Sequence, residues 1–245
     1  MSLIAAVFDR YWAFFRRRLL NPSLCKVLRE PVVSALSRVV WLAHFSKWLR
    51  VTGCQITHRD RYELYQSIVD RVGGHGVVDY LEFGVHRGES LKWWIGALKN
   101  PTARLYGFDV FTGLPEEWGA LPRGAFDCQG SPPDISDRRV QFEVGLFQSV
   151  LPAFLERYLP NGSRKKIVHL DADLYSSTLF VLSSLARQLR PGDVLVFDEF
   201  GSVRNPTHEF RAFHDFCAAF QPCYIVLGAT ALYEQVAIEI VGSSA

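Results

Sequence analysis

Two short apolar runs, at residues 167–170 and 194–197, constrain the fold of this chain most strongly. Polar or turn residues bound each run, and neither run alternates with polar positions. Uninterrupted apolar runs of this length are typical of strands buried on both faces of a parallel sheet. We therefore expect two buried strands.

A helical pattern separates the two predicted strands. Apolar residues recur at helical spacing over residues 179–189, Ser176, Ser177 or Thr178 can cap the start, and Pro191-Gly192 ends the pattern. A strand, a helix and a second strand form one βαβ unit, in which the strands lie parallel.

Acidic residues follow both predicted strands. Asp171 and Asp173 come after the first strand, and Asp198 and Glu199 come after the second. The carboxyl ends of parallel strands meet at one edge of the sheet, where open α/β sheets bind their ligands. Carboxylates gathered there predict a site for a hard metal cation.

A glycine turn follows an earlier predicted strand at residues 77–83. It reads acid-x-Gly-x-x-x-Gly, with Glu82, Gly84 and Gly88, and precedes a helical pattern at residues 89–98. The next predicted strand, residues 104–108, ends in Asp109. An acid in that position is placed to accept hydrogen bonds from ribose hydroxyls.

Further strands are predicted at residues 140–144, 223–227 and 235–240, and the last two can pair antiparallel. Helical patterns separate most of the strands. The fold class is therefore α/β, with a doubly wound, mostly parallel sheet of seven strands. The intervening residues 111–138 are rich in Gly, Pro and Asp, and we interpret them as an ordered lid beside the site.

Residues 1–61 carry eleven Lys or Arg against three Asp or Glu, a net charge of +8 in a chain whose total is +2. Amphipathic helices are predicted at residues 3–20, 31–51 and 60–72. The first is too short and too charged to span a membrane. We expect residues 1–56 to form a helical extension that acts as a lid, a dimerisation element or a membrane-surface contact through residues 1–50, and residues 57–245 to form the main domain.

The five cysteines are scattered and contain no C-x-x-C pair, which favours neither a disulfide framework nor a zinc site. We expect a cytoplasmic protein, either free or peripheral at the inner membrane face. A homo-oligomer is expected. Nucleic-acid binding is not, because the basic residues lie in an apolar-rich segment.

A glycine turn with a ribose acid fits a dinucleotide oxidoreductase or a methyltransferase that uses S-adenosylmethionine (SAM). The turn lacks the Gly-x-Gly-x-x-Gly pattern that pyrophosphate needs, and Glu82 would repel pyrophosphate. The second class is therefore favoured.

Five stretches resemble the macrocin O-methyltransferase (TylF/NovP-type) family of class I SAM-dependent methyltransferases, and the resemblance covers about residues 57–242. The stretches are YLEFGVHRGESL, LYGFDVFTGLPEEW, GLFQSVLP, VHLDADLYSST and PGDVLVFDEF. The resemblance implies a Rossmann-like methyltransferase sheet, SAM, Mg²⁺ and methylation of a hydroxyl, often on a deoxysugar.

The resemblance also implies roles for individual residues. Glu82, Gly84 and Gly88 would lie around the methionine part of SAM, with Asp109 on the ribose. Asp171, Asp198 and Glu199 would hold the metal; the last position is often Asp in the family, so Glu199 departs from the pattern.

The expected chemistry is Mg²⁺-assisted methylation of a sugar or another polyhydroxylated acceptor, in natural-product or glycan biosynthesis. We favour Asp171 as the proton acceptor and place Asp173 second. One alternative is a catechol-type phenol methyltransferase, which Leu174 disfavours because an amine base would be expected there. The other is a catalytically idle, membrane-associated binding module, against which the intact acid pairs count.

Overall fold

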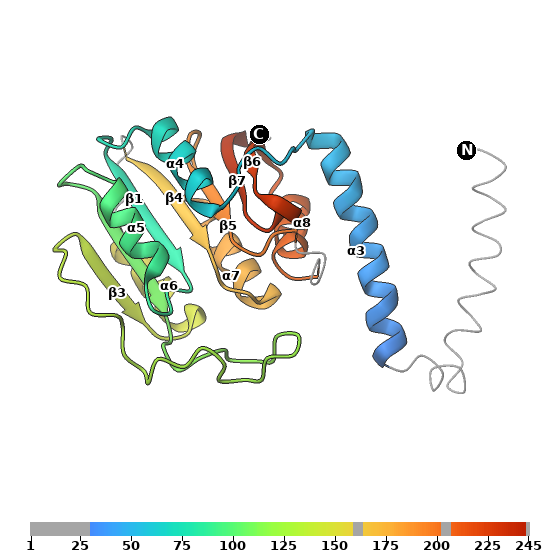
Figure 1. Cartoon of the computed structure of the whole chain (residues 1–245). Coiled ribbons are helices and arrows are strands. Elements are labelled where there is room, and N and C mark those ends of the chain that lie inside the picture. Colours follow the sequence, from blue (N-terminus) through green and yellow to red (C-terminus); the bar gives the residue numbers. More distant parts are fainter. Residues whose placement is uncertain (1–29, 159–163, 202–206, 244–245) are drawn as a thin grey trace, which may run out of the picture. The chain divides into compact units, whose positions relative to one another are not determined.

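The computed structural model describes residues 30–158, 164–201 and 207–243 (Figure 1). The chain divides into two compact units, residues 1–41 and 42–245. Only residues 30–41, the first part of helix α3 (Glu30–Thr52), are described in the first unit. The helix predicted at residues 3–20 lies outside the described residues. No described helix is long and apolar enough to cross a membrane.

Seven strands form one sheet in the order β3-β2-β1-β4-β5-β7-β6. Their bounds are β1 (Val78–Phe83), β2 (Arg104–Asp109), β3 (Val140–Val144), β4 (Lys165–Leu170), β5 (Val194–Phe197), β6 (Pro222–Ala229) and β7 (Val236–Ser243). The first five strands pair in parallel, and β7 pairs antiparallel with both β5 and β6. This topology confirms the predicted fold class.

Helices cover both faces of this sheet (Figure 1). On one face, α4 (Arg61–Val72) and α5 (Glu89–Ala97) bury Tyr65 and Trp94 against β1. On the other face lie α6 (Phe147–Arg157), α7 (Tyr175–Leu185) and α8 (Glu209–Phe220). Phe154 of α6 packs against Phe108, and a short 3-10 helix (Ala231–Tyr233) connects β6 to β7.

The last part of α3, within the unit of residues 42–245, packs on the segment that follows β5. Trp48 lies 5.0 Å from Phe200 between ring centroids, and its indole N–H donates to Tyr224 Oη at 3.0 Å. Phe45 packs edge-on against Phe210 at 5.0 Å. This apolar contact anchors residues 42–52 of the helix beside the end of β5.

One predicted helix start differs from the structure. Helix α7 begins at Tyr175 after Leu174, and no side chain caps it. The predicted cap Ser176 instead lies inside the helix, where its hydroxyl donates to Glu116 Oε1 at 2.7 Å. Ser176 therefore misled the prediction, because a tertiary partner competes for its hydroxyl.

Gly84 lies close to the backbone of Asp171, just past the ends of β1 and β4. Its φ is +96°, and a Cβ built on it would lie 1.8 Å from the carbonyl oxygen of Asp171. The cause is the parallel register, which pairs Phe83 with Leu170 and so places the next residue of each strand side by side. Only glycine tolerates both this φ and this contact.

We expect Gly84→Ala to destabilise the fold by at least about 3 kcal/mol, because a methyl group would overlap the backbone of Asp171. Gly96→Ala is the control. Gly96 lies in α5 with nothing within 4 Å of a built Cβ, so alanine there should stabilise the helix by up to about 1 kcal/mol. Urea unfolding of both variants measures the difference; equal midpoints would show that the close approach is not a constraint.

Candidate active site

Backbone hydrogen bonds carry the sheet beyond the ends of three strands. Gly84 N–H donates to Phe108 O at 2.9 Å, Asp171 N–H to Phe83 O at 2.9 Å, and Asp198 N–H to Leu170 O at 3.0 Å. Each residue that follows a strand is therefore held level with the end of its neighbour. The predicted gathering of acids at one sheet edge follows from this arrangement.

A cavity of about 300 Å³ opens at this edge. Strand ends supply Gly84, Asp109, Asp171 and Asp198 to its lining, and Asp173 and Glu199 also line it. The remaining wall comes from loops and from the first turns of α4 and α6; its main members are Arg61, His86, Leu114, Trp118, Phe126, Leu146, Phe147 and Gln148. Apolar and aromatic walls around convergent carboxylates are typical of a small-molecule site.

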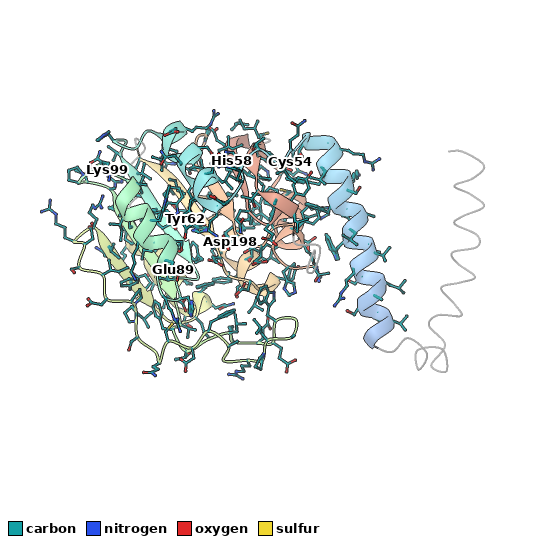
Figure 2. The ribbon with its side chains drawn as sticks, in the orientation of Figure 1. Cys54, His58, Tyr62, Glu89, Lys99 and Asp198 are labelled. Carbon is teal, nitrogen blue, oxygen red and sulfur yellow. The ribbon has the colours of Figure 1, made fainter. Side chains whose placement is uncertain are left out.

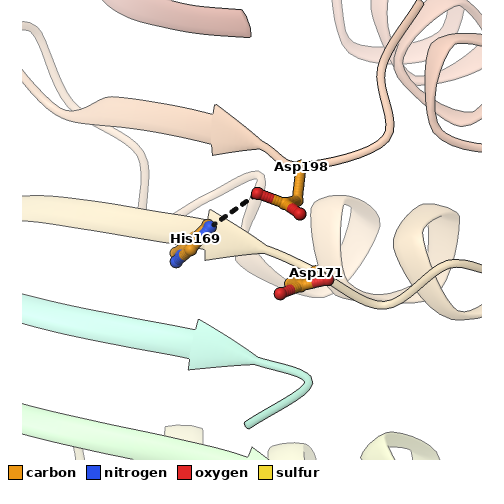
Figure 3. Close-up of side chains that lie close together, drawn as sticks. All are labelled: His169, Asp171 and Asp198. Atoms are coloured by element: carbon orange, nitrogen blue, oxygen red, sulfur yellow. Dashed lines mark ion pairs between the residues drawn. The ribbon is translucent and has the colours of Figure 1, made fainter. Parts of the chain in front are cut away.

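His169, Asp171 and Asp198 bring ligand atoms within 4.8 Å of one another (Figure 3). Asp171 and Asp198 follow the ends of the neighbouring strands β4 and β5 (Figure 3), and Asp198 also lies close to α4 (Figure 2). Carboxylates are the donors that Mg²⁺ prefers, so the two aspartates fit this ion. Glu199 is outside the compact group but lines the same cavity.

His169 is fully buried, as a core histidine would be. Its Nε2 lies 3.2 Å from the Tyr65 hydroxyl, and its Nδ1 lies 2.7 Å from the Tyr80 hydroxyl. It also lies 3.9 Å from Asp198 and 3.8 Å from Glu82. Both ring nitrogens have protein partners, so His169 holds neighbouring side chains in place rather than offering a lone pair to the cavity.

Burial and neighbouring charges shift the pKa values of the acids in different directions. Burial, reinforced by the charges of Asp198 and Asp173, raises the pKa of Asp171 well above its usual range. Burial and the charge of Glu199 raise the pKa of Asp173 to about 7. Burial alone would raise the pKa of Asp198, but the neighbouring His169 and Arg61 outweigh burial, so the pKa of Asp198 is lowered. Separated values of this kind suit a site that moves a proton.

The residues predicted to bind the cofactor fall into two groups. Gly84 and Asp109 line the cavity. Glu82 does not, because it is fully buried and accepts a hydrogen bond from the Ser90 hydroxyl. Gly88 does not either: a Cβ there would meet Pro133 at 3.0 Å.

Asp109 holds two loops together. Its Oδ2 accepts from the backbone N–H groups of Val85 and His86, and its Oδ1 accepts from that of Phe111, each at 2.8 Å. A carboxylate has about four acceptor positions, so roughly one is left for a ribose hydroxyl.

Two lining residues, Arg61 and Gln148, were missed by the sequence analysis. Arg61 pairs with Asp198 at 3.2 Å, and Gln148 comes from the first turn of α6. Trp118 belongs to the long loop, whose predicted position beside the site is confirmed. Its buried indole N–H has no partner in the described structure. No periodic pattern marks these residues, although a tryptophan in a Gly/Pro-rich loop is itself a signal.

The buried Glu209 of α8 was also missed. Its Oε2 accepts the backbone N–H of Glu199 at 2.9 Å, and burial raises its pKa well above the usual range. Glu209 thereby fixes the backbone of the acid pair from behind. By contrast, Tyr175 packs away from the cavity, donating to Asp215 at 3.0 Å beneath the Arg211 guanidinium.

The part of the chain that contains this site is similar to a known domain. A model described as a methyltransferase domain matches residues 81–200, which include the end of β1, strands β2 to β5 and all of the predicted site residues. The chain contains a methyltransferase domain. The resemblance predicted from the five sequence stretches is thereby confirmed, and the sheet order is that of class I SAM-dependent methyltransferases.

One curated relative is the 8-demethyl-8-(2,3-dimethoxy-alpha-L-rhamnosyl)-tetracenomycin-C 4'-O-methyltransferase of Streptomyces olivaceus. It is 28% identical over 179 residues, which cover 62% of this chain and 65% of the relative. The match thus spans just under two thirds of the relative's length.

Two solved structures share the fold of the methyltransferase domain, each at a TM-score of 0.56 and 20% identity. The calicheamicin methyltransferase CalS11 covers 74% of this chain and 80% of its own. The O-methyltransferase NovP covers 74% of this chain and 79% of its own.

Glu82 should make stability depend on pH. Burial raises its pKa from 4.5 to about 7 in the folded protein, so the native state binds more protons than the unfolded state between these values. The protonated Glu82 carboxyl makes its full contribution to the free energy of unfolding below about pH 4.5. As the pH rises to about 7, this free energy falls by up to about 3 kcal/mol. We expect Glu82→Gln to remove this loss. In urea unfolding, the free energy of unfolding of the variant should therefore rise relative to that of wild type between pH 5 and pH 8.

The exposed Glu89 supplies the control for this prediction. Glu89→Gln should follow the wild-type pH profile, because it removes a carboxylate from solvent rather than from the core. A Glu82→Gln variant whose profile also matches wild type would show that the Glu82 carboxyl is not held protonated by burial.

Proposed function

We propose that this protein is a Mg²⁺-dependent SAM O-methyltransferase that methylates a hydroxyl of a sugar or another polyhydroxylated small molecule. The observation that carries the proposal is the backbone contact between Gly84 and Asp171. It brings a nucleotide-type turn and a pair of cation-binding acids into one cavity. A methyl donor and an activated hydroxyl must meet in just such a space for in-line transfer.

The donor half of the site would be formed by the ends of β1, β2 and β3. Gly84 leaves room for the methionine part of SAM, Asp109 retains about one acceptor position for ribose, and Leu146 and Phe147 offer apolar surface to adenine. Glu82 and Gly88 would act from behind the cavity wall. Glu82 lies beneath the turn, and Gly88 is the N-cap residue of α5, with a φ of +72°.

The metal would be held by Asp171, Asp198 and Glu199. Bound there, Mg²⁺ would lower the pKa of the acceptor hydroxyl and orient it. The protein's own contribution is to fix the acids: the Phe83 carbonyl holds Asp171, the Leu170 carbonyl holds Asp198, and Glu209 holds Glu199.

Asp173 becomes the favoured proton acceptor, ahead of Asp171. It lines the cavity with a φ of +57°, a conformation that aspartate adopts at a cost, and its pKa is raised to about 7. A carboxyl with this pKa is a better base near neutral pH than an ordinary aspartate. Asp171, at the contact with Gly84, is better placed to bind the cation.

The acceptor class rests on the relatives and on the cavity wall. The curated relative acts on a rhamnosyl group, as its name states. In this chain Trp118 and Phe126 line the cavity. Their flat apolar faces suit the C–H face of a sugar ring, and the buried Trp118 N–H can donate to a ring hydroxyl. The described residues of the cavity lining include no lysine, the amine base that would be expected for a catechol acceptor.

A membrane-surface role for residues 1–50, a homo-oligomer and a cytoplasmic location remain predictions. So does the boundary of the two domains at residues 56 and 57.

We expect Asp171→Asn to abolish turnover and weaken Mg²⁺ binding at least tenfold, with SAM affinity nearly unchanged. Asp173→Asn should lower kcat about 10²- to 10⁴-fold while both affinities stay within about twofold, because it removes the base alone. Single-turnover kinetics and titration calorimetry measure these quantities. The exposed Asp134→Asn is the matched control. Normal turnover in Asp173→Asn would return the role of base to Asp171.

The enzyme itself is tested by calorimetric titration with SAM, followed by methyl transfer to a panel of rhamnosides and other glycosides with Mg²⁺ or with EDTA. We expect SAM binding in both conditions and methyl transfer with Mg²⁺ alone. Failure to bind SAM would defeat the proposal, and full activity in EDTA would remove the metal from it.

A further inference from the structure

Helix α4 reaches into the cavity from outside the matched methyltransferase domain. Its first residue, Arg61, lies 3.2 Å from Asp198 Oδ2, and Tyr65, one turn later, donates to Asp198 Oδ1 at 3.4 Å. One carboxylate of the candidate metal site is therefore contacted on both oxygens by a single helix.

The two contacts differ in mobility. Tyr65 is fully buried, so its hydroxyl is fixed. The Arg61 side chain is 39% exposed, on a helix anchored by the Asp60 cap and a buried face. A long side chain on a fixed helix can swing away from its partner without moving the backbone.

Charge explains why Arg61 lies where it does. Five carboxylates line the cavity: Asp109, Asp171, Asp173, Asp198 and Glu199. Among the described residues of that lining, Arg61 is the one Lys or Arg. Its guanidinium therefore neutralises the acid that a divalent cation would also need.

We propose that Arg61 is the resident counter-ion of Asp198 and that a divalent cation must displace it to load the site. Before a cation binds, the positive charge of Arg61 offsets the repulsion among the acids. It also lowers the affinity of the site for the cation, because it competes for the same Asp198 oxygen and repels the dication. This inference rests on the metal site of the proposed function. A purely structural ion pair would act oppositely, because its loss would loosen Asp198 and weaken cation binding.

The test is a titration of the full chain with Mn²⁺, followed through the EPR signal of the free ion, without SAM or acceptor. We expect Arg61→Gln to bind Mn²⁺ about tenfold more tightly than wild type, and Mg²⁺ to compete for the same site. Arg61→Lys keeps the charge and should stay close to wild type. Arg59→Gln is the control, because Arg59 is largely exposed and pairs with Glu63.

Unchanged or weaker Mn²⁺ binding by a folded Arg61→Gln variant would overturn the inference and leave the metal site standing. Absence of binding by wild type and variant alike would overturn the metal site and, with it, the inference. If Arg61→Gln does not fold, Arg61→Met, which keeps the apolar stem, serves in its place with the same expected tightening.

Discussion

The continuation of the parallel ladder past the strand ends is the constraint on which the site depends. Three backbone bonds fix Gly84, Asp171 and Asp198 level with their neighbours, and the lack of a Cβ at Gly84 lets the turn touch the backbone of Asp171. Only main-chain atoms therefore separate the turn at Gly84 from the acids Asp171 and Asp198. Their spacing is set by the sheet, one of the most rigid parts of a protein, rather than by loop conformation.

The same clustering of acids destabilises the folded state when no cation is bound. Burial raises the pKa values of Asp171, Asp173 and Glu209 together, so these carboxyls favour the neutral form where the fold places them. Asp198 escapes this trend because His169 and Arg61 face it. Ionised acids without counter-charges would repel one another in a low dielectric, and a bound cation would relieve that repulsion. The proposed affinity for a cation and the repulsion among the acids therefore arise from one arrangement.

The sequence predicted what local pattern and parallel pairing dictate. Apolar runs gave the strands, and once the strands were parallel, the acids at their ends had to meet. The position of Glu82 could not be predicted this way, because β1 is buried along its whole length and has no alternation to show where a side chain points. The three backbone partners of Asp109 depend on loop conformation, and the contact of Arg61 with Asp198 joins distant segments. Neither leaves a periodic signal in the sequence.

The helices before residue 81 complete the site. Phe45 and Trp48 pack on Phe200, directly after the Asp198-Glu199 pair, and a Cβ on Gly201 would lie 2.7 Å from Phe45. Arg61 and Tyr65 then contact Asp198 from the cavity side. The end of β5 is thus held between two segments that the methyltransferase domain model does not include. A segment outside the matched domain that contacts Asp198 is well placed to tune the proposed metal binding and acceptor choice without altering the sheet that positions the acids.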